Sequence, residues 1–242
     1  MPSASASGDA STARARAAAP APSWRASAAR AALACALLVG LFWALSRFGG
    51  DGPNLHGQAL RPQAAPAFTG LLDTHGKPYD WTAQRGAAVL VFFGYTHCPD
   101  VCPLTMVRLA HVLEQLGPQG RDVHVVFVTL DPLRDTPAVL RAYLDALLPS
   151  AQGLRGDAAD TARAAAQWGV HWRRAGAPGQ AAGGDDDYWI DHTAAVTLVG
   201  PHGHLRARYG YAQLAAHDLL LQDLRTLLRR ARASVGAPGG DA

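Results

Sequence analysis

Two short apolar runs, each followed by the signals of a helix, constrain the fold of this chain most strongly. Residues 87–93 and 123–130 are rich in valine and phenylalanine and contain no Asp, Glu, Lys or Arg. Such runs are typical of strands that are buried on both faces of a sheet. Residues 103–116 then repeat apolar side chains at helical spacing, and Thr136 with Pro137 supplies the cap and first residue of another helix. Strands that alternate with helices predict an α/β fold, with a central mixed β-sheet flanked by helices.

The remaining elements follow from turn and capping residues. An N-terminal hairpin is expected where an Asp-Thr-His-Gly turn separates two β-rich stretches, and a second hairpin around a Pro-His-Gly turn. In chain order, we expect a hairpin of residues 67–72 and 78–81, helices over residues 137–148 and 157–169, a hairpin of residues 194–199 and 205–209, and a terminal helix over residues 214–230.

The charge distribution excludes nucleic acid as a partner. The chain has 22 basic and 19 acidic residues. Five arginines and one aspartate lie within residues 1–50, which leaves 17 basic and 18 acidic residues in the remainder. A nearly neutral folded region without a basic block does not neutralise the phosphates of a nucleic acid.

Three cysteines are too few for a disulfide framework, so the domain depends on its core.

An apolar stretch near the N-terminus predicts a membrane anchor. Residues 31–46 carry no charge and are flanked by Arg30 and Arg47. The stretch is slightly shorter than the ~20 residues that a spanning helix uses, but flanking arginines can snorkel to the interface. The excess of arginine before the stretch predicts a cytoplasmic N-terminus and an exported domain. We therefore expect a single-pass protein of the inner membrane, with its domain in the periplasm.

The predicted organisation has five parts. They are a disordered basic tail (1–29), a transmembrane anchor (30–48), a Gly/Pro-rich linker (49–66), the α/β domain (67–232) and a disordered C-terminal tail (233–242). A cleaved signal peptide is an alternative for the leader. A mitochondrial presequence, with the domain at the mitochondrial inner membrane, fits less well because Pro20 and Pro22 interrupt an amphipathic helix. Each version places the domain in an oxidising compartment.

The segment GYTHCPDVCP, residues 94–103, carries the most informative chemistry. It lies where a buried strand ends and a helix begins, the usual place for a ligand in an open α/β sheet. Cys98 and Cys102 are four residues apart, so a helical turn would bring their Cβ atoms to about 5–6 Å on one face. This spacing allows a disulfide or the binding of one ion by both sulfurs. A helix N-terminus also favours the thiolates that both chemistries require.

Two sulfurs are an incomplete set of metal ligands, and His192 is our candidate for the third. It lies just before the strand predicted for residues 194–199, which can adjoin the cysteine loop in an α/β sheet. His97 is the alternative, although neighbouring side chains on a tight turn tend to point apart. Two thiolates and one imidazole form a soft, low-coordinate set that favours Cu(I) and can also hold Cu(II) with weak additional ligands.

Three segments together resemble the Sco/SenC family of copper-binding, thioredoxin-fold proteins. Besides GYTHCPDVCP, these are VTLDPLRDTP at residues 128–137 and YWIDHTA at residues 188–194. Their order and separation are also similar to those of the family. The resemblance implies a thioredoxin-like fold, and it implies that copper is bound by Cys98, Cys102 and His192.

The resemblance further implies a copper metallochaperone that assists assembly of the binuclear copper centre of cytochrome c oxidase. The expected partner is the copper-bearing subunit of that oxidase, or another copper donor or acceptor. Asp131 and Arg134 carry over as residues that shape a loop. The chain departs from the family at Gly200, where relatives often have an acidic residue, and in a Gly/Asp-rich insert over residues 176–187.

Two other hypotheses use the same residues. A membrane-anchored thiol–disulfide oxidoreductase would cycle Cys98 and Cys102 through a disulfide and reduce the cysteines of a copper-receiving partner. The proline that thioredoxins carry before the last hairpin is absent, which disfavours a general reductase. A catalytic zinc site is the third hypothesis, but no general base accompanies it. The leading hypothesis is the metallochaperone, a binding protein rather than an enzyme with turnover.

Overall fold

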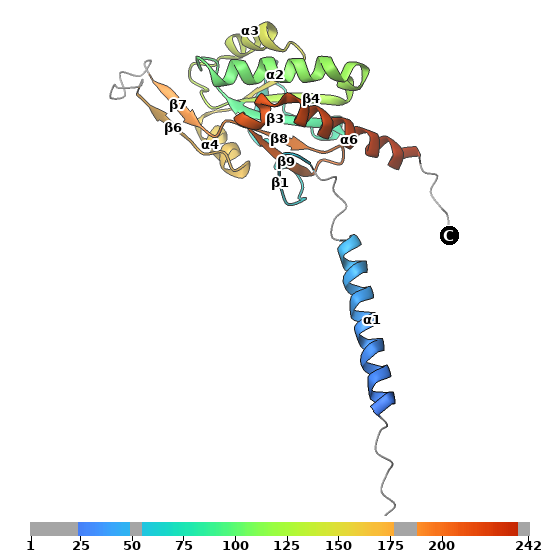
Figure 1. Cartoon of the computed structure of the whole chain (residues 1–242). Coiled ribbons are helices and arrows are strands. Elements are labelled where there is room, and N and C mark those ends of the chain that lie inside the picture. Colours follow the sequence, from blue (N-terminus) through green and yellow to red (C-terminus); the bar gives the residue numbers. More distant parts are fainter. Residues whose placement is uncertain (1–23, 49–54, 177–187, 237–242) are drawn as a thin grey trace, which may run out of the picture. The chain divides into compact units, whose positions relative to one another are not determined.

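The structure is a computed structural model that describes residues 24–48, 55–176 and 188–236. The chain divides into two compact units, of which the first contains helix α1 (Trp24–Phe48) and the second is an α/β domain (Figure 1). α1 begins before the predicted boundary at residue 30, so part of the predicted disordered tail is helical. Within the described part of the chain, no helix is both long and apolar enough to cross a membrane, and the anchor predicted over residues 30–48 is not confirmed.

A seven-stranded mixed sheet forms the centre of the domain. Its strands are β1 (Gln58–Ala59), β2 (Leu72–Asp73), β3 (Ala88–Gly94), β4 (Val123–Thr129), β5 (Gln152–Arg155), β8 (Ala195–Val199) and β9 (Leu205–Gly210). They lie in the order β1-β9-β8-β3-β4-β5-β2. β3, β4 and β5 are parallel, whereas every other neighbouring pair is antiparallel. The two apolar runs of the sequence thus form adjacent central strands, and the predicted mixed sheet is confirmed.

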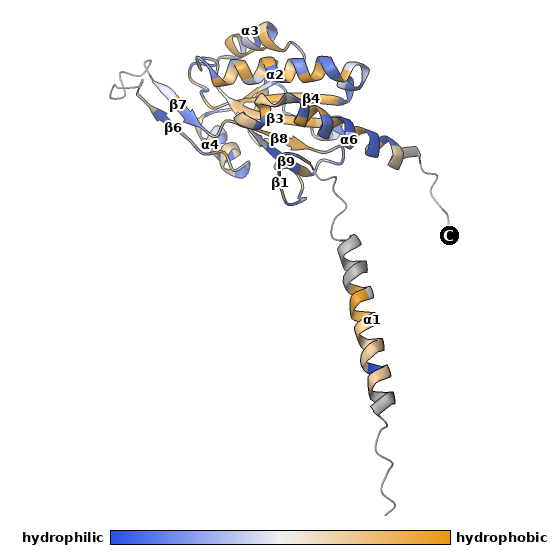
Figure 2. Cartoon of the chain, in the orientation of Figure 1, coloured by the Kyte–Doolittle hydropathy of each residue, from blue (hydrophilic) through white to orange (hydrophobic). Residues whose placement is uncertain are grey.

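Five α-helices accompany the sheet in the described part of the domain. They are α2 (Val101–Leu116), α3 (Pro137–Leu147), α4 (Ala158–Gln167), α5 (Tyr211–Ala215) and α6 (His217–Gly236). α2 packs against α3, α5 and α6. As predicted, the Thr136 side chain caps α3 by accepting a hydrogen bond from the Val139 N–H. Figure 2 shows apolar residues along the central strands, whereas the helices carry both apolar and polar residues.

Both faces of the sheet are covered, because successive side chains of a strand point to opposite faces. Phe92 of β3 packs against Phe127 of β4, and Phe127 packs against Tyr143 of α3. Phe93, the next residue, packs instead against Trp168, which follows α4. The two faces therefore have separate aromatic contacts, one beneath α2 and α3 and the other beside α4.

The segment before β2 belongs to the domain and not to a linker. β1 pairs with β9, with Gln58 opposite Arg208. Further along, the Ala65 N–H donates to the Gly203 carbonyl at 2.8 Å. The predicted linker over residues 49–66 is therefore too long, because backbone hydrogen bonds to a sheet edge need no apolar pattern in the sequence. Residues 49–54 lie outside the described part of the chain.

Other predicted boundaries differ in the same way. The predicted N-terminal hairpin is reduced to a bridge between Leu72 and Pro78, and β2 pairs mainly with β5. Helix α6 continues to Gly236, beyond the predicted end of the domain at residue 232. A separate two-stranded sheet of β6 (Trp172–Ala175) and β7 (Trp189–His192) was not predicted. Residues 1–23, 177–187 and 237–242, which include most of the predicted tails and insert, lie outside the described residues.

We expect the core beneath the site to dominate the stability of the domain. Leu90 of β3 is fully buried, so Leu90→Ala should lower the free energy of unfolding by about 2–5 kcal/mol through lost burial and a residual cavity. Leu133→Ala is the matched control, because Leu133 is 65% exposed and should change stability by less than about 0.5 kcal/mol. Urea denaturation of both variants tests this, and equal losses would contradict the assigned core.

Candidate metal site

The two cysteines of the motif lie at the junction of β3 and α2. α2 begins at Val101, so Cys102 lies in its first turn while Cys98 lies in the preceding loop. Cys102 is fully buried and Cys98 is partly exposed, and both are free thiols. The backbone N–H of Cys102 donates to the Cys98 sulfur at 3.4 Å. Cys98 thus accepts a hydrogen bond from an N–H group that the helix leaves without an internal partner.

Gly94, the last residue of β3, leaves the room in which the Cys102 side chain lies. A Cβ atom at this position would lie 3.0 Å from the Cys102 sulfur and 3.1 Å from the ring of Phe127. That is closer than ordinary van der Waals contact. The absence of a side chain at residue 94 therefore lets the sulfur pack directly against the end of the strand.

His192 comes from the hairpin of β6 and β7 and reaches the same sulfur. Its Nε2 lies 3.4 Å from Sγ of Cys102. Its other ring nitrogen, Nδ1, lies 3.2 Å from the Thr193 carbonyl oxygen. Because a carbonyl only accepts, Nδ1 is the donor in this contact, and Nε2 is the ring nitrogen that faces the sulfur. The imidazole also packs edgewise against Tyr95 and Phe92, with ring centroids about 6 Å away.

The structure therefore brings together Cys98, Cys102 and His192, the three residues that the sequence singled out. An open depression is lined by residues 171–173 and 191–193, His192 among them. The Cys102 sulfur is closed off from solvent, whereas Cys98 is within reach of it. A reagent from solution meets Cys98 before Cys102.

The two thiols differ strongly in acidity. The pKa of Cys98 is lowered to about 4, chiefly by the hydrogen bond from the Cys102 thiol, with further help from His192 and from the N–H groups of Asp100 and Cys102, while burial opposes the shift. The pKa of Cys102 is raised far above its usual value by the same thiol–thiolate hydrogen bond and by burial. At neutral pH the pair is one thiolate and one thiol that share a proton.

For His97, the alternative third ligand, the structure describes contacts with Thr96 and Asp135 and none with the thiols. Its Nδ1 lies 3.1 Å from the Thr96 hydroxyl and 3.7 Å from Asp135, and its side chain is half exposed. His97, Asp131 and Asp135 place possible ligand atoms within 4.8 Å of one another. However, Arg134 Nε lies 2.5 Å from Asp131, so a guanidinium already supplies the positive charge there. This second cluster is held by protein donors and does not resemble a metal site.

The SCO1/SenC family model matches residues 57–229, which is most of the chain. The chain belongs to the SCO1/SenC family. The mouse mitochondrial SCO2 homologue is 36% identical over 147 residues, which cover 60% of this chain and 56% of that protein. The SCO1/SenC chain thus spans little more than half the length of this relative.

Solved structures of Sco proteins share the fold of this SCO1/SenC chain. Apo Sco1 from Thermus thermophilus is 32% identical with a TM-score of 0.61, over 74% of this chain and 99% of that one. Copper-bound ScoI from Bradyrhizobium japonicum is 33% identical with a TM-score of 0.53, over 66% of this chain and 96% of that one. The predicted thioredoxin-like Sco fold is thereby confirmed.

Two buried residues of this SCO1/SenC site were missed by sequence reasoning. Asp135 accepts hydrogen bonds from the N–H and the hydroxyl of Thr96 in the cysteine loop. Tyr188 donates its hydroxyl proton to Asp131 at 2.5 Å. Both lie within the segments that carry the family resemblance, but a one-dimensional motif does not say which groups meet. Loop-shaping was expected of Asp131 and Arg134 alone.

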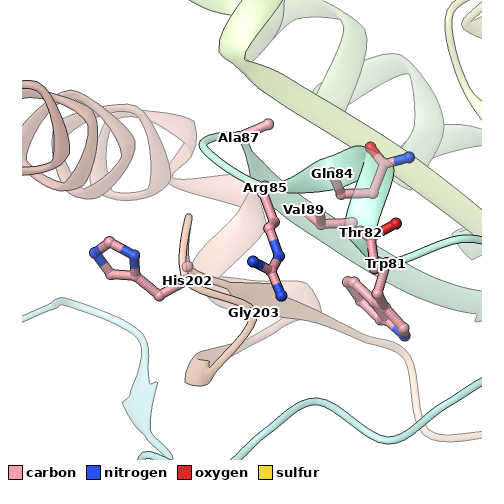
Figure 3. Close-up of a pocket in the computed structure, with 9 residues that line it drawn as sticks. Trp81, Thr82, Gln84, Arg85, Ala87, Val89, His202 and Gly203 are labelled. Carbon is pink, nitrogen blue, oxygen red and sulfur yellow. The ribbon is translucent and has the colours of Figure 1, made fainter. Parts of the chain in front are cut away.

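A second hollow of the SCO1/SenC domain lies away from the thiols. Figure 3 shows this pocket of about 150 Å³ near the start of β3, with Trp81, Arg85 and His202 among its lining residues. Gly200 also lines it. The lining contains no cysteine and no carboxylate, so it lacks the soft ligands of the cysteine site.

The acidity of Cys98 predicts an unusual pH dependence of its reactivity. Because its pKa is about 4, the side chain is already a thiolate above roughly pH 5. Alkylation of Cys98 by iodoacetamide in the copper-free chain should therefore be nearly constant between about pH 6 and 8, whereas an ordinary thiol reacts roughly tenfold faster per pH unit. Peptide mass spectrometry resolves Cys98 from Cys35 and Cys102.

The control is Cys102→Ala, which removes the largest cause of the lowered pKa. In this variant the pKa of Cys98 should rise, and its alkylation should accelerate with pH over the same interval. A wild-type rate that climbs steeply with pH would show that Cys98 is an ordinary thiol.

Proposed function

We propose that this chain is a copper metallochaperone that holds one copper through Cys98, Cys102 and His192. The observation that carries the proposal is the 3.4 Å approach of His192 Nε2 to the Cys102 sulfur, across ninety residues of sequence. The copper-bound relative from Bradyrhizobium japonicum supports the choice of metal. We further propose that the chain assists assembly of the binuclear copper centre of cytochrome c oxidase, and that its partner is the copper-bearing subunit.

The donor set suits copper chemically. Two sulfurs and one imidazole are soft ligands, and three ligands satisfy the low coordination number of Cu(I). The Cys98 thiolate is available without loss of a proton, and Nε2 is the ring nitrogen of His192 that faces the sulfurs. Cys102 must release its proton when it binds, so copper binding should liberate about one proton per ion near neutral pH.

Because the two thiols differ in exposure, a donor or acceptor of copper should contact Cys98 first. Cys98 is the sulfur that a ligand of a donor or acceptor protein can approach, while Cys102 and Phe92 lie behind it in the core. Copper would therefore be exchanged on the side of Cys98 and His192. In the copper-free chain, the Cys102 sulfur remains protonated until copper binds.

A dithiol reductase is the second candidate, and the unequal acidity of the thiols favours it. The Cys98 thiolate would attack a disulfide of the copper-receiving partner and form a mixed disulfide, with one partner thiolate leaving. Cys102, after losing its proton, would then attack Cys98 Sγ, release the second partner thiol and leave a Cys98–Cys102 disulfide. The two electrons pass from this chain to the partner. His192 is not a reactant in this scheme.

Residues outside the domain enter the proposal as predictions. We propose that the N-terminal segment attaches the domain to the inner membrane and that the domain acts in the periplasm. The mouse relative is a mitochondrial protein, which fits a function beside a respiratory membrane. Protease protection of the full chain in inverted and right-side-out vesicles measures this orientation directly.

The His192→Ala variant distinguishes the two candidate functions. His192→Ala should lower Cu(I) affinity by more than about a hundredfold, since even groups that merely orient a ligand are worth 10–100-fold. The same variant should retain thiol–disulfide exchange if the chain is only a reductase. Competition with a chromophoric Cu(I) chelator and a disulfide-exchange assay are performed on the same sample.

His97→Ala is the matched control, because His97 precedes Cys98 but has its described contacts with Thr96 and Asp135. It should keep copper binding within about threefold of the wild type. If His97→Ala loses copper and His192→Ala retains it, the proposed ligand set is wrong. If neither histidine matters but either cysteine does, the reductase is the better description.

A further inference from the structure

Tyr188 joins the hairpin that carries His192 to a loop of the main domain. It lies directly before β7 and is 6% exposed. Its hydroxyl donates to Oδ1 of Asp131, a fully buried carboxylate that follows β4. The bond spans 57 residues of sequence and has an O···O distance of 2.5 Å. Hydrogen bonds to an ionised acceptor are among the strongest in proteins, so this contact holds two distant segments together.

Two guanidinium groups enclose the same tyrosine ring. Arg134 lies over the ring with its central carbon 3.7 Å from the centroid, and it also donates from Nε to Asp131. Arg174, which lies on β6 opposite Ile190, has its central carbon 4.5 Å from the centroid. Cation–π contacts of this kind are attractive when they are shielded from water. The ring therefore contacts one arginine of the hairpin and one arginine of the domain.

The loop that receives Tyr188 also holds the cysteine loop. Residues 131–135, which we call the anchor loop, carry Asp131 at one end and Asp135 at the other. Asp135 accepts from the Thr96 N–H at 3.1 Å and from its hydroxyl at 2.5 Å. Thr96 is two residues before Cys98. The anchor loop is thus hydrogen-bonded both to the segment that carries the thiols and to the hairpin that carries the imidazole.

The hairpin lies outside the central sheet, so side-chain and loop contacts determine its position. β6 and β7 form a sheet of their own and do not pair with the seven-stranded sheet. An isolated two-stranded hairpin is at best marginally stable in water, so its orientation depends on contacts at its base. On the side of the thiols, these contacts are the rings against His192, the buried side chain of Ile190 and the hydrogen bond of its backbone with Tyr95. At the anchor loop, they are the hydrogen bond of the Tyr188 hydroxyl to Asp131 and the contact of its ring with Arg134.

We propose that Tyr188 is a positioning residue for the metal site: its hydrogen bond to Asp131 keeps the hairpin closed, so that His192 stands beside the two thiols before copper arrives. This inference rests on the proposed ligand set. The apparent affinity of a site equals its intrinsic affinity multiplied by the fraction of molecules that are competent to bind. Weakening the link lowers that fraction without altering any ligand.

The test variant is Tyr188→Phe, which keeps the ring between the two arginines and removes only the hydroxyl. We expect Cu(I) affinity to fall about tenfold, the factor that corresponds to roughly 1.4 kcal/mol. In the copper-free full chain, we also expect faster hydrogen exchange of the β6 and β7 amides, because the hairpin opens more often. The exchange rates of the β3 and β4 amides should not change.

Tyr209→Phe is the matched control. Tyr209 is also buried and donates to a buried carboxylate, Asp223, at 2.6 Å, but it lies in β9. Its loss should lower thermal stability to a similar degree and leave copper affinity unchanged. If Tyr209→Phe weakens copper binding as much as Tyr188→Phe does, the effect is a general loss of stability and the proposal is overturned.

A double variant separates positioning from a structural role. In a His192→Ala background, Tyr188→Phe should cause no further loss of affinity, because the hairpin no longer carries a ligand. A second tenfold loss there, or an unchanged affinity in the single variant, overturns the proposal. Failure of the ligand set is seen separately, since the wild-type chain would then bind no copper or would retain it after His192→Ala.

Discussion

Two carboxylates without access to solvent, Asp131 and Asp135, impose the constraint on which the site depends. A buried carboxylate is costly unless hydrogen-bond donors surround it. The donors come from separate parts of the chain: Thr96 from the cysteine loop, Thr129 from the end of β4 and Tyr188 from the base of the hairpin. Satisfying the two carboxylates therefore brings the cysteine loop and the hairpin to one short loop. The meeting of thiols and imidazole is a consequence of this arrangement.

The sequence predicted well those elements whose own residues determine their structure. The strands β3 and β4 are apolar on both faces, and a continuous apolar run is visible in one dimension. The cap of α3 by Thr136 is likewise a local interaction. The cysteine motif was located correctly at the junction of β3 and α2, because the run, the loop and the helical pattern follow one another directly.

What the sequence did not predict depends on partners that lie far along the chain. β1 and β2 are two-residue edge strands held by backbone hydrogen bonds, which leave no side-chain pattern. In the hairpin of β6 and β7, two arginines lie between Trp172 and Ala175 and a long connection separates the strands, so no alternating pattern marked it. The sequence shows that Tyr188 and Asp135 are present, but it does not show that each forms a hydrogen bond between the anchor loop and another segment. Those bonds exist only because the fold brings the anchor loop beside the cysteine loop and the hairpin.

Cys98 is accessible while Cys102 is enclosed by Gly94, Phe92 and the first turn of α2. Of the two sulfurs, that of Cys98 is therefore the one that another protein can approach. Under the proposed metallochaperone function, a copper donor and a copper acceptor would both need this thiolate, so they would have to bind in turn. Between the two encounters the chain alone would hold the ion, and the rate of copper dissociation would set how long it can wait for the acceptor.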